Sequence, residues 1–312
     1  MSIQNRETLE PAAVQPAAGW AAPGPMDECR SLLHRKAFRL SHCLQGHPLF
    51  HVDTLIGVAQ EAAKRKRDLY FDAGEVTVTD KWGNIPVPDL PVAEVIRRIE
   101  SAGAWVIMKH VESDPRYKAV LDEFADYVRT VAGPEGAALL CNPEMLVLIT
   151  SPRRVTPFHF DAEVNFLVQL HGSKDVWVCD PQDRSITTEE DIERYYAVSS
   201  IAGNYKPLAE ERATKFVLSP GDAIHIPSHG AHWVRNHDNV SVSLSLNFEF
   251  PRWKQADVYR ANHLLRRLGM SPKPPGQSAL VDRTKAAVVA GTRPIRPAVA
   301  AVTGPIRRLL HR

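Results

Sequence analysis

His159 and Asp161 are the residues whose types and spacing most directly suggest chemistry in this chain. They lie two positions apart in the run 156–165 (Thr-Pro-Phe-His-Phe-Asp-Ala-Glu-Val-Asn), which predicts a β-strand. Side chains at positions i and i+2 of a strand point to the same face, so this imidazole and this carboxylate can hold one metal ion together. Asn165 lies four positions after Asp161 and shares that face if no bulge intervenes.

A third metal ligand is expected from the stretch 221–234, which contains three histidines. His232 begins a predicted strand and is the candidate, while His225 and His229 are its rivals. Two imidazoles and one carboxylate on one face of an ion leave three positions open, as in the facial triad of non-haem Fe(II) oxygenases. Zinc hydrolases also use two histidines and a carboxylate, so the ligand types leave the choice of metal open.

The second half of the sequence predicts the strands that must carry these ligands. A helix is expected in the insertion 181–213, with Thr187 or Thr188 as N-cap and Glu190 or Asp191 as capping-box partner. A succession of about eight short strands is typical of a β-barrel or a β-sandwich. The predicted strands are 145–150, 155–161, 164–171, 175–180, 214–218, 222–226, 231–236 and 240–250.

The last of these strands alternates without error between two kinds of side chain. One face of 240–250 is aliphatic or aromatic, and the other carries Ser, Ser, Ser, Asn and Glu. We expect the polar face to look into a closed barrel around a polar ligand, with Asn247 in the cavity and the apolar face against outer helices. The alternative is a plain surface strand with its serines in water.

The first half of the sequence predicts helices. Asp53 caps one helix, Pro91 starts a second, and Asp114 with Pro115 opens a third that ends at Gly133. A further helix follows Pro251, with an apolar stripe formed by Trp253, Ala256, Leu264, Leu265 and Leu268. We therefore divide the chain into a disordered arm (1–25), a helical scaffold with one or two strands (26–140), a strand-rich domain (141–250) and a C-terminal helix with a basic tail (251–312).

Composition indicates a globular protein. Its 312 residues are 44% apolar and carry a net charge of +2. From residue 251 on there are 13 Lys and Arg against 2 Asp and Glu, which leaves 25 against 34 in the body. The asymmetry is compatible with an anionic partner for the tail, but docking of the tail on the acidic body or solvation of the tail is favoured, and no nucleic-acid partner is expected. Cys29, Cys43, Cys141 and Cys179 show no paired spacing, and no signal peptide or membrane span is recognisable, so a cytoplasmic protein is expected.

The stretches 155–181 and 221–250 together resemble the Jumonji-C/cupin-like branch of the Fe(II)- and 2-oxoglutarate-dependent oxygenases. They are most similar to the asparaginyl hydroxylases that act on the hypoxia-inducible transcription factor. By this resemblance, the metal ligands are His159, Asp161 and His232. The residues that bind 2-oxoglutarate are Thr156, Asn165, Lys174 and Asn247, and Lys174 grips the distal carboxylate.

The resemblance implies a double-stranded β-helix (jelly-roll) core wrapped by N- and C-terminal helices. It also implies a dioxygenase that uses Fe(II), 2-oxoglutarate and O₂, releases succinate and CO₂, and hydroxylates a C–H of a protein or peptide side chain. The alternatives are a small-molecule hydroxylase, an N-demethylase of the same chemistry, or a non-catalytic cupin-like protein that binds a ligand to regulate others. A homodimer through the C-terminal helix is a further expectation.

The sequence also suggests roles for several other polar residues, with less specific support. Relatives bind the cosubstrate with a tyrosine from the N-terminal half, for which Tyr117 and Tyr127 are the candidates. His171 is in phase with Asn165, which would place it near the pocket, but a structural role is favoured. Contact with an acidic substrate and solvation at the surface are the two alternatives for three arginines, Arg153, Arg154 and Arg184.

Overall fold

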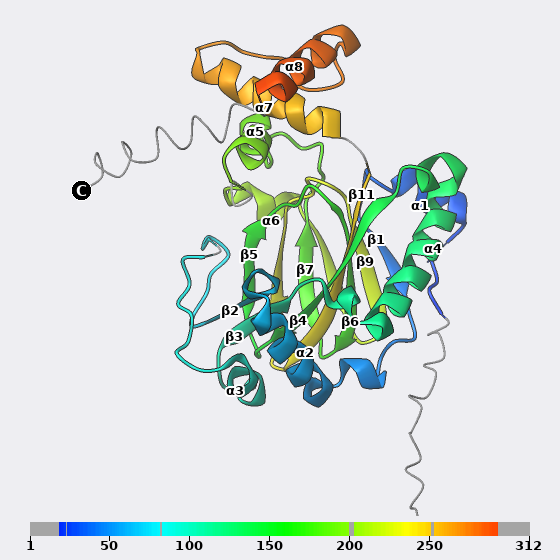
Figure 1. The fold of residues 1–312 in the computed structure, drawn as a ribbon, viewed down its shortest axis with the longest axis vertical. Helices are drawn as coiled ribbons and strands as arrows, with labels where there is room; N and C mark the ends of the chain where they lie inside the picture. The colour runs from blue at the N-terminus through cyan, green and yellow to red at the C-terminus, as the bar shows by residue number, and fades with distance from the viewer. Residues whose placement is uncertain (1–18, 23, 82, 200–202, 251–252, 293–312) are drawn as a thin grey trace, which may run out of the picture.

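Two antiparallel sheets face each other at the centre of the computed structural model, which describes residues 19–22, 24–81, 83–199, 203–250 and 253–292 (Figure 1). One sheet has seven strands in the order β1-β9-β6-β11-β4-β3-β2, and the other has four in the order β5-β10-β7-β8. The strands are β1 (Phe38–Ser41), β2 (Leu69–Ala73), β3 (Ala104–Met108), β4 (Cys141–Thr150), β5 (Val155–His159), β6 (Val164–His171), β7 (Lys174–Val178), β8 (Thr214–Leu218), β9 (Asp222–Ile226), β10 (His232–Asn236) and β11 (Ser241–Glu249).

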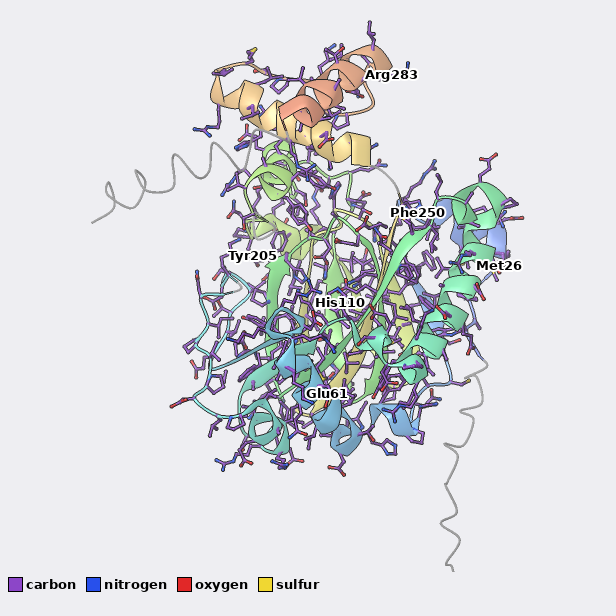
Figure 2. The ribbon with its side chains drawn as sticks, viewed as in Figure 1. Met26, Glu61, His110, Tyr205, Phe250 and Arg283 are labelled. Carbon is purple, nitrogen blue, oxygen red and sulfur yellow. The ribbon has the colours of Figure 1, made fainter. Side chains whose placement is uncertain are left out.

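Helices surround the two sheets. The α-helices are α1 (Met26–Leu32), α2 (Val52–Lys64), α3 (Val92–Arg97), α4 (Pro115–Ala137), α5 (Glu189–Ala197), α6 (Leu208–Arg212), α7 (Trp253–Arg267) and α8 (Ala279–Thr292). The short 3₁₀ helices are η1 (Pro48–Phe50), η2 (Lys66–Asp68) and η3 (Val111–Ser113). The pair α7 and α8 lies at one end of the molecule, beyond α5 (Figure 1), and Arg283 marks α8 there in Figure 2.

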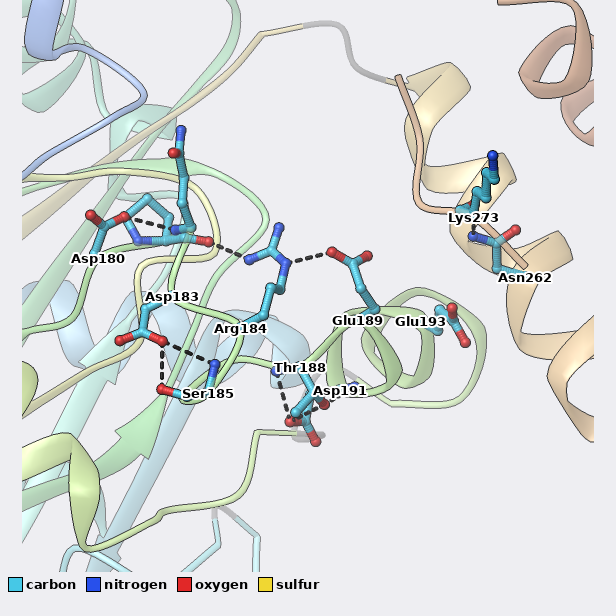
Figure 3. Close-up of polar contacts among 12 residues, drawn as sticks. Asp180, Asp183, Arg184, Ser185, Thr188, Glu189, Asp191, Glu193, Asn262 and Lys273 are labelled. Carbon is cyan, nitrogen blue, oxygen red and sulfur yellow. Dashed lines mark hydrogen bonds and ion pairs between the residues drawn. The ribbon is translucent and has the colours of Figure 1, made fainter. Parts of the chain in front are cut away.

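Most predicted helix starts agree with the caps that the structure contains. The Asp114 carboxylate accepts a hydrogen bond from the backbone N–H of Arg116 at the start of α4. Thr188 and Asp191 form the predicted capping box of α5 (Figure 3). The prediction for α2 was wrong by two residues, because His51 is its N-cap and Asp53 lies in the first turn.

The predicted double-stranded β-helix with outer helices is confirmed. Each of the eight predicted strands is present, as β4 to β11. The sequence did not predict β1, a four-residue strand that pairs with β9 at one edge of the larger sheet. Three strands from the first half of the chain thus belong to that sheet, rather than the expected one or two.

The alternation of β11 works as predicted. Leu244, Leu246 and Phe248 point outward and are fully buried, and the ring of Phe248 lies 5.8 Å from that of Phe124 on α4. Ser243 and Asn247 lie on the opposite face of β11, which is the face directed into the space between the sheets. The largest apolar cluster therefore lies outside the seven-stranded sheet, and the space between the sheets holds these polar residues beside a smaller apolar cluster that includes Ile224 and Ile226.

The C-terminal helix buries a different face from the one predicted. Val258, Tyr259 and Ala261 of α7 are buried, whereas Leu264 is 51% and Leu268 is 76% exposed. Of the predicted stripe, Ala256 and Leu265 are half-buried and Leu264 and Leu268 are exposed, while the side chain of Trp253 lies outside the described part of the structure. No helix in the described part of the chain has the length and apolar character that crossing a membrane requires.

Arg154 serves the fold rather than an acidic substrate. Its guanidinium is 2% exposed and bonds to the fully buried carboxylate of Asp72, and it also donates to the carbonyl oxygens of Gly74 and Gly103. Its neighbour Arg153 is exposed. Arg184 bonds to Glu189 at the start of α5. Arg154 thus ties β2 to the segment that leads into β5.

We expect Arg154→Met to lower the free energy of unfolding by about 3–5 kcal/mol, because the carboxylate of Asp72 would stay buried without its cation. Chemical denaturation with urea measures this. Arg153→Gln is the matched control, since Arg153 pairs only at 3.6 Å with Asp238 and both side chains are exposed. Its effect should stay below about 1 kcal/mol. Equal effects of the two substitutions would contradict the structural role of Arg154.

Candidate metal centre and anion site

The paired strands β5 and β10 bring two of the predicted metal ligands together. His159 on β5 lies directly opposite His232 on β10, so both side chains point to the same face. Asp161 follows in the turn after β5 and completes the group. Their ligand atoms all lie within 4.8 Å of one another, and Oδ2 of Asp161 is 3.9 Å from Nε2 of either histidine.

Backbone carbonyls hold both imidazoles in the orientation that metal binding requires. Nδ1 of His159 lies 2.8 Å from the carbonyl oxygen of Pro157, and Nδ1 of His232 lies 2.9 Å from that of Gly230. A carbonyl oxygen can only accept, so each Nδ1 carries the proton and each Nε2 is the ring atom whose lone pair can bind a metal. Burial lowers the pKa of each of these two histidines to about 4, which keeps both rings neutral at pH 7.

The three residues fit a divalent metal ion. Burial raises the pKa of Asp161, while His232 and Lys109 act in the opposite direction. A bound dication would favour the ionised carboxylate. Two neutral imidazoles and one carboxylate suit iron, and they also occur at zinc, so the donor set allows both metals.

A bulge in β5 brings Thr156 onto the same face as His159. The residues His159 and Thr156 are three apart, and a regular strand would put them on opposite faces. Their pairing partners on β10, Val234 and His232, are only two residues apart. Strand β5 therefore carries one extra residue between Thr156 and His159. Pro157 lies in this bulge, where a residue without an N–H is tolerated.

Lys174 is a buried cation inside the barrel. It is 3% exposed, and its Nζ donates a hydrogen bond to Oγ of Ser243, 2.7 Å away. Burial alone lowers the pKa of Lys174 to about 7, and no carboxylate among the described residues is paired with it. Such a group is costly unless an anion accompanies it.

Gln169 supports this lysine and was missed by the sequence analysis. Its Oε1 accepts from Ser243, and its Nε2 donates to Ser241 and to the carbonyl oxygens of His171 and Gly172. The hydroxyl of Ser243 is thereby oriented with its lone pairs toward Lys174. The period of β6 was the signal, because Gln169 is four residues after Asn165 and on the same face.

The two asparagines lie side by side on neighbouring strands. Asn165 on β6 is opposite Asn247 on β11, and Nδ2 of Asn165 donates to Oδ1 of Asn247 at 2.7 Å. Asn165 also donates to Ser245, while its own Oδ1 is buried without a partner. Oδ1 of Asn165 can therefore still accept a hydrogen bond on this interior face.

The strand ends beside the asparagines are acidic. Glu144 is opposite Asn247, and Glu163 and Glu249 extend the same faces of β6 and β11. Burial, with the negative charges of Asp161, Glu249 and Glu144, raises the pKa of Glu163 to about 7. A substrate approaching here would meet more carboxylates than cations.

Two rivals of His232 are not metal ligands in this arrangement. His225 faces away from the interior and stacks on Phe38 at 4.6 Å, and burial lowers its pKa to about 3. His229 lies in the turn before β10, where its Nε2 is 2.9 Å from the hydroxyl of Tyr196. His225 points outward because side chains alternate along β9, and its neighbours Ile224 and Ile226 point inward.

The remaining pocket candidates also lie elsewhere. His171 is exposed, because a bulge in β6 places it opposite the outward-facing Val242. The hydroxyl of Tyr117 donates to the carbonyl oxygen of Leu49 in the outer core. Tyr127, one helix turn after Phe124, packs on that ring in the same core. Neither tyrosine reaches the interior, so both cosubstrate candidates from the N-terminal half were wrong.

We expect Lys174→Met to stabilise the ligand-free protein by a few kcal/mol at pH 7. With a pKa of about 7 instead of about 10.5, the folded protein binds fewer protons at this site than the unfolded chain between those two values. The lysine's contribution to stability therefore rises with pH across that window. The advantage of the variant should shrink as the pH approaches 10, as urea denaturation at several pH values would show. A constant difference would argue against a buried, unpaired ammonium.

Comparisons with known proteins found one family model and several solved structures that are similar to parts of this chain. Residues 105–252 match the family described as "Cupin-like domain". The X-ray structure of YcfD from Escherichia coli is 13% identical, with a TM-score of 0.49 over 87% of this chain and 68% of that one. YcfD, described as a ribosomal oxygenase, in complex with cobalt and 2-oxoglutarate is 12% identical with a TM-score of 0.46, over 87% and 67% of the two chains. Its complex with cobalt and succinic acid is 12% identical with a TM-score of 0.45, over the same shares. The stretch 105–252 is thus similar to the cupin-like domain family, and His159, Asp161 and His232 lie within that stretch.

Proposed function

We propose that this protein is an Fe(II)- and 2-oxoglutarate-dependent dioxygenase. The observation that carries the proposal is the buried Lys174, a cation without a carboxylate partner among the described residues, in the same interior as the group His159, Asp161 and His232. A metal site alone is compatible with many activities. A metal site together with an interior cation is what a chelating dicarboxylate needs.

The register of the strands orders these groups along the interior. Lys174 precedes Val178, the residue opposite His232, by four positions, or about 13 Å along the strand. Thr156 is opposite Val234 and so lies between the two levels. An extended lysine side chain and a five-carbon dicarboxylate together can span this separation.

Each residue then has a defined task. His159, Asp161 and His232 hold the metal, and Lys174 with the Thr156 hydroxyl binds the distal carboxylate of 2-oxoglutarate. Near the chelating end, Asn247 donates from its Nδ2, and Asn165 orients that amide through its hydrogen bond to Oδ1 of Asn247. When bound, the iron supplies the redox chemistry by which 2-oxoglutarate and O₂ become succinate and CO₂ while a C–H is hydroxylated. The protein positions these groups and limits the access of water.

The proposed substrate is a side chain of a protein or peptide, in line with the resemblance to asparaginyl hydroxylases. The carboxylates of Glu144, Glu163 and Glu249 favour a substrate group that is neutral or positively charged. A small-molecule substrate, N-demethylation, and non-catalytic ligand binding are the alternatives. The homodimer through the C-terminal helix also stays a prediction, which the mass in solution tests.

We expect the purified protein with Fe(II), ascorbate and 2-oxoglutarate to form succinate. Calorimetry with Mn(II) in place of iron should show that the metal tightens binding of 2-oxoglutarate. His159→Ala should lose the metal. Lys174→Met should keep the metal but bind 2-oxoglutarate about 10- to 150-fold more weakly, through the loss of charge-assisted hydrogen bonds worth about 1.5–3 kcal/mol.

Lys215→Met is the matched control, because Lys215 is also a strand lysine but pairs with Asp175 at the surface. It should bind 2-oxoglutarate like the wild type. Absence of both succinate and metal-dependent 2-oxoglutarate binding would refute the proposed function. Metal-dependent binding without succinate, in the presence of peptides, would favour the non-catalytic alternative.

A further inference from the structure

Asp161 is held differently from the two histidines of the metal group. Each imidazole is oriented by its own hydrogen bond to a backbone carbonyl. The carboxylate of Asp161, in contrast, accepts no hydrogen bond from the residues that the structure describes, and its side chain is 37% exposed. Asp161 also lies beyond the end of β5, outside the ladder of the sheet. Its position therefore depends on what holds its backbone.

Two hydrogen bonds hold that backbone. The carbonyl oxygen of Asp161 accepts from the N–H of His229 at 2.7 Å. The next N–H, that of Ala162, donates to the hydroxyl of Tyr195 at 3.2 Å. The side chain of His229 is in turn hydrogen-bonded to the hydroxyl of Tyr196 at 2.9 Å. Both anchors therefore lead to consecutive tyrosines at the end of α5.

Helix α5 is itself fastened to α7. Arg266 of α7 donates two hydrogen bonds of 2.9 Å to Glu193, which is 1% exposed. Arg260 donates to the carbonyl oxygen of Tyr196 at 3.1 Å, and the rings of Tyr196 and Tyr259 stack at 5.5 Å. Figure 3 shows Glu193 on the side of α5 that faces α7, with the capping box at the start of the helix. A continuous set of contacts thus joins the C-terminal helix to the metal carboxylate.

We propose that Tyr195 is a positioning residue for the metal ligand Asp161, and that the docking of α7 on α5 is coupled to metal affinity. This proposal rests on the metal site of the proposed function. Groups that orient a metal ligand without touching the metal commonly change affinity by about 10- to 100-fold. Coupling of this kind is reciprocal, so the metal should also tighten the packing of α7 on α5.

The first test uses Co(II) as the probe and Tyr195→Phe as the variant, which removes only the hydroxyl. We expect Co(II) to bind about 10- to 100-fold more weakly, measured by competition with a chelator, and the Co(II) absorption spectrum to change. Tyr205→Phe is the matched control, because Tyr205 belongs to the same aromatic cluster but its hydroxyl bonds to Glu210. It should leave both readouts unchanged.

The outcomes separate this proposal from the proposed function. If the wild type binds no Co(II), the metal site itself is wrong. If the wild type binds and Tyr195→Phe has the same affinity and spectrum, the positioning role is refuted while the metal site stands. A Tyr195→Phe variant that binds Co(II) more weakly, with an altered spectrum but the wild-type melting temperature in the absence of metal, supports the positioning role.

The second test addresses α7. We expect Arg266→Gln to weaken Co(II) binding about 5-fold or more, which corresponds to the lower end of typical coupling between sites. The neighbouring Arg267 is exposed, so Arg267→Gln is the control and should bind like the wild type. Co(II) should also raise the melting temperature of Arg266→Gln by less than that of the wild type. Equal affinities for the two variants would overturn the coupling to α7.

Discussion

The polar interior of the barrel is the constraint on which the rest of this structure depends. A buried ammonium such as Lys174 and a row of buried amides and hydroxyls must find partners inside, because water does not satisfy them there. Ser243 and Gln169 provide some of these partners. On β11, which carries Ser243, the alternate apolar side chains are directed outward, and helices cover them. The helical layer on the larger sheet is therefore a consequence of the site.

Two bulges decide which polar side chains reach this interior. In β5, one extra residue turns Thr156 to the face of His159. In β6, a bulge after Gln169 turns His171 away from the face that Asn165 occupies. A single inserted residue reverses the orientation of every side chain beyond it, because the period of a strand is two. The composition of the interior is therefore set by irregularities as much as by the alternation.

The insertion between β7 and β8 adds a second layer of control over the metal group. Its helix α5 starts at a capping box and ends in tyrosines that reach the turn of Asp161 and the turn of His229. The imidazoles belong to the rigid ladder of β5 and β10, while the carboxylate belongs to a turn. The rigidity of the site thus has two sources, one within the sheet and one outside it.

Predictions from the sequence succeeded where they rested on local patterns. The eight strands, the capping box of Thr188 and the outward face of β11 follow from short-range periodicity and capping chemistry, and the structure contains all of them. The predictions failed for the cap at Asp53, for the cosubstrate candidates Tyr117 and Tyr127, and for the stripe of α7. The Tyr117 hydroxyl bonds to the distant Leu49, and a bulge turns His171 outward; neither a long-range contact nor a bulge leaves a local signal.

The sequence by itself determined the types of chemistry available: a histidine and a carboxylate two apart on a strand, a third histidine on another strand, and a lysine that the family resemblance assigns to the cosubstrate. Only the tertiary structure decided that His159 and His232 are opposite each other, that Lys174 has no carboxylate beside it among the described residues, and that α5 holds the turn of Asp161. The physical reason is that strand pairing, burial and long-range hydrogen bonds join residues that lie tens of positions apart in the chain.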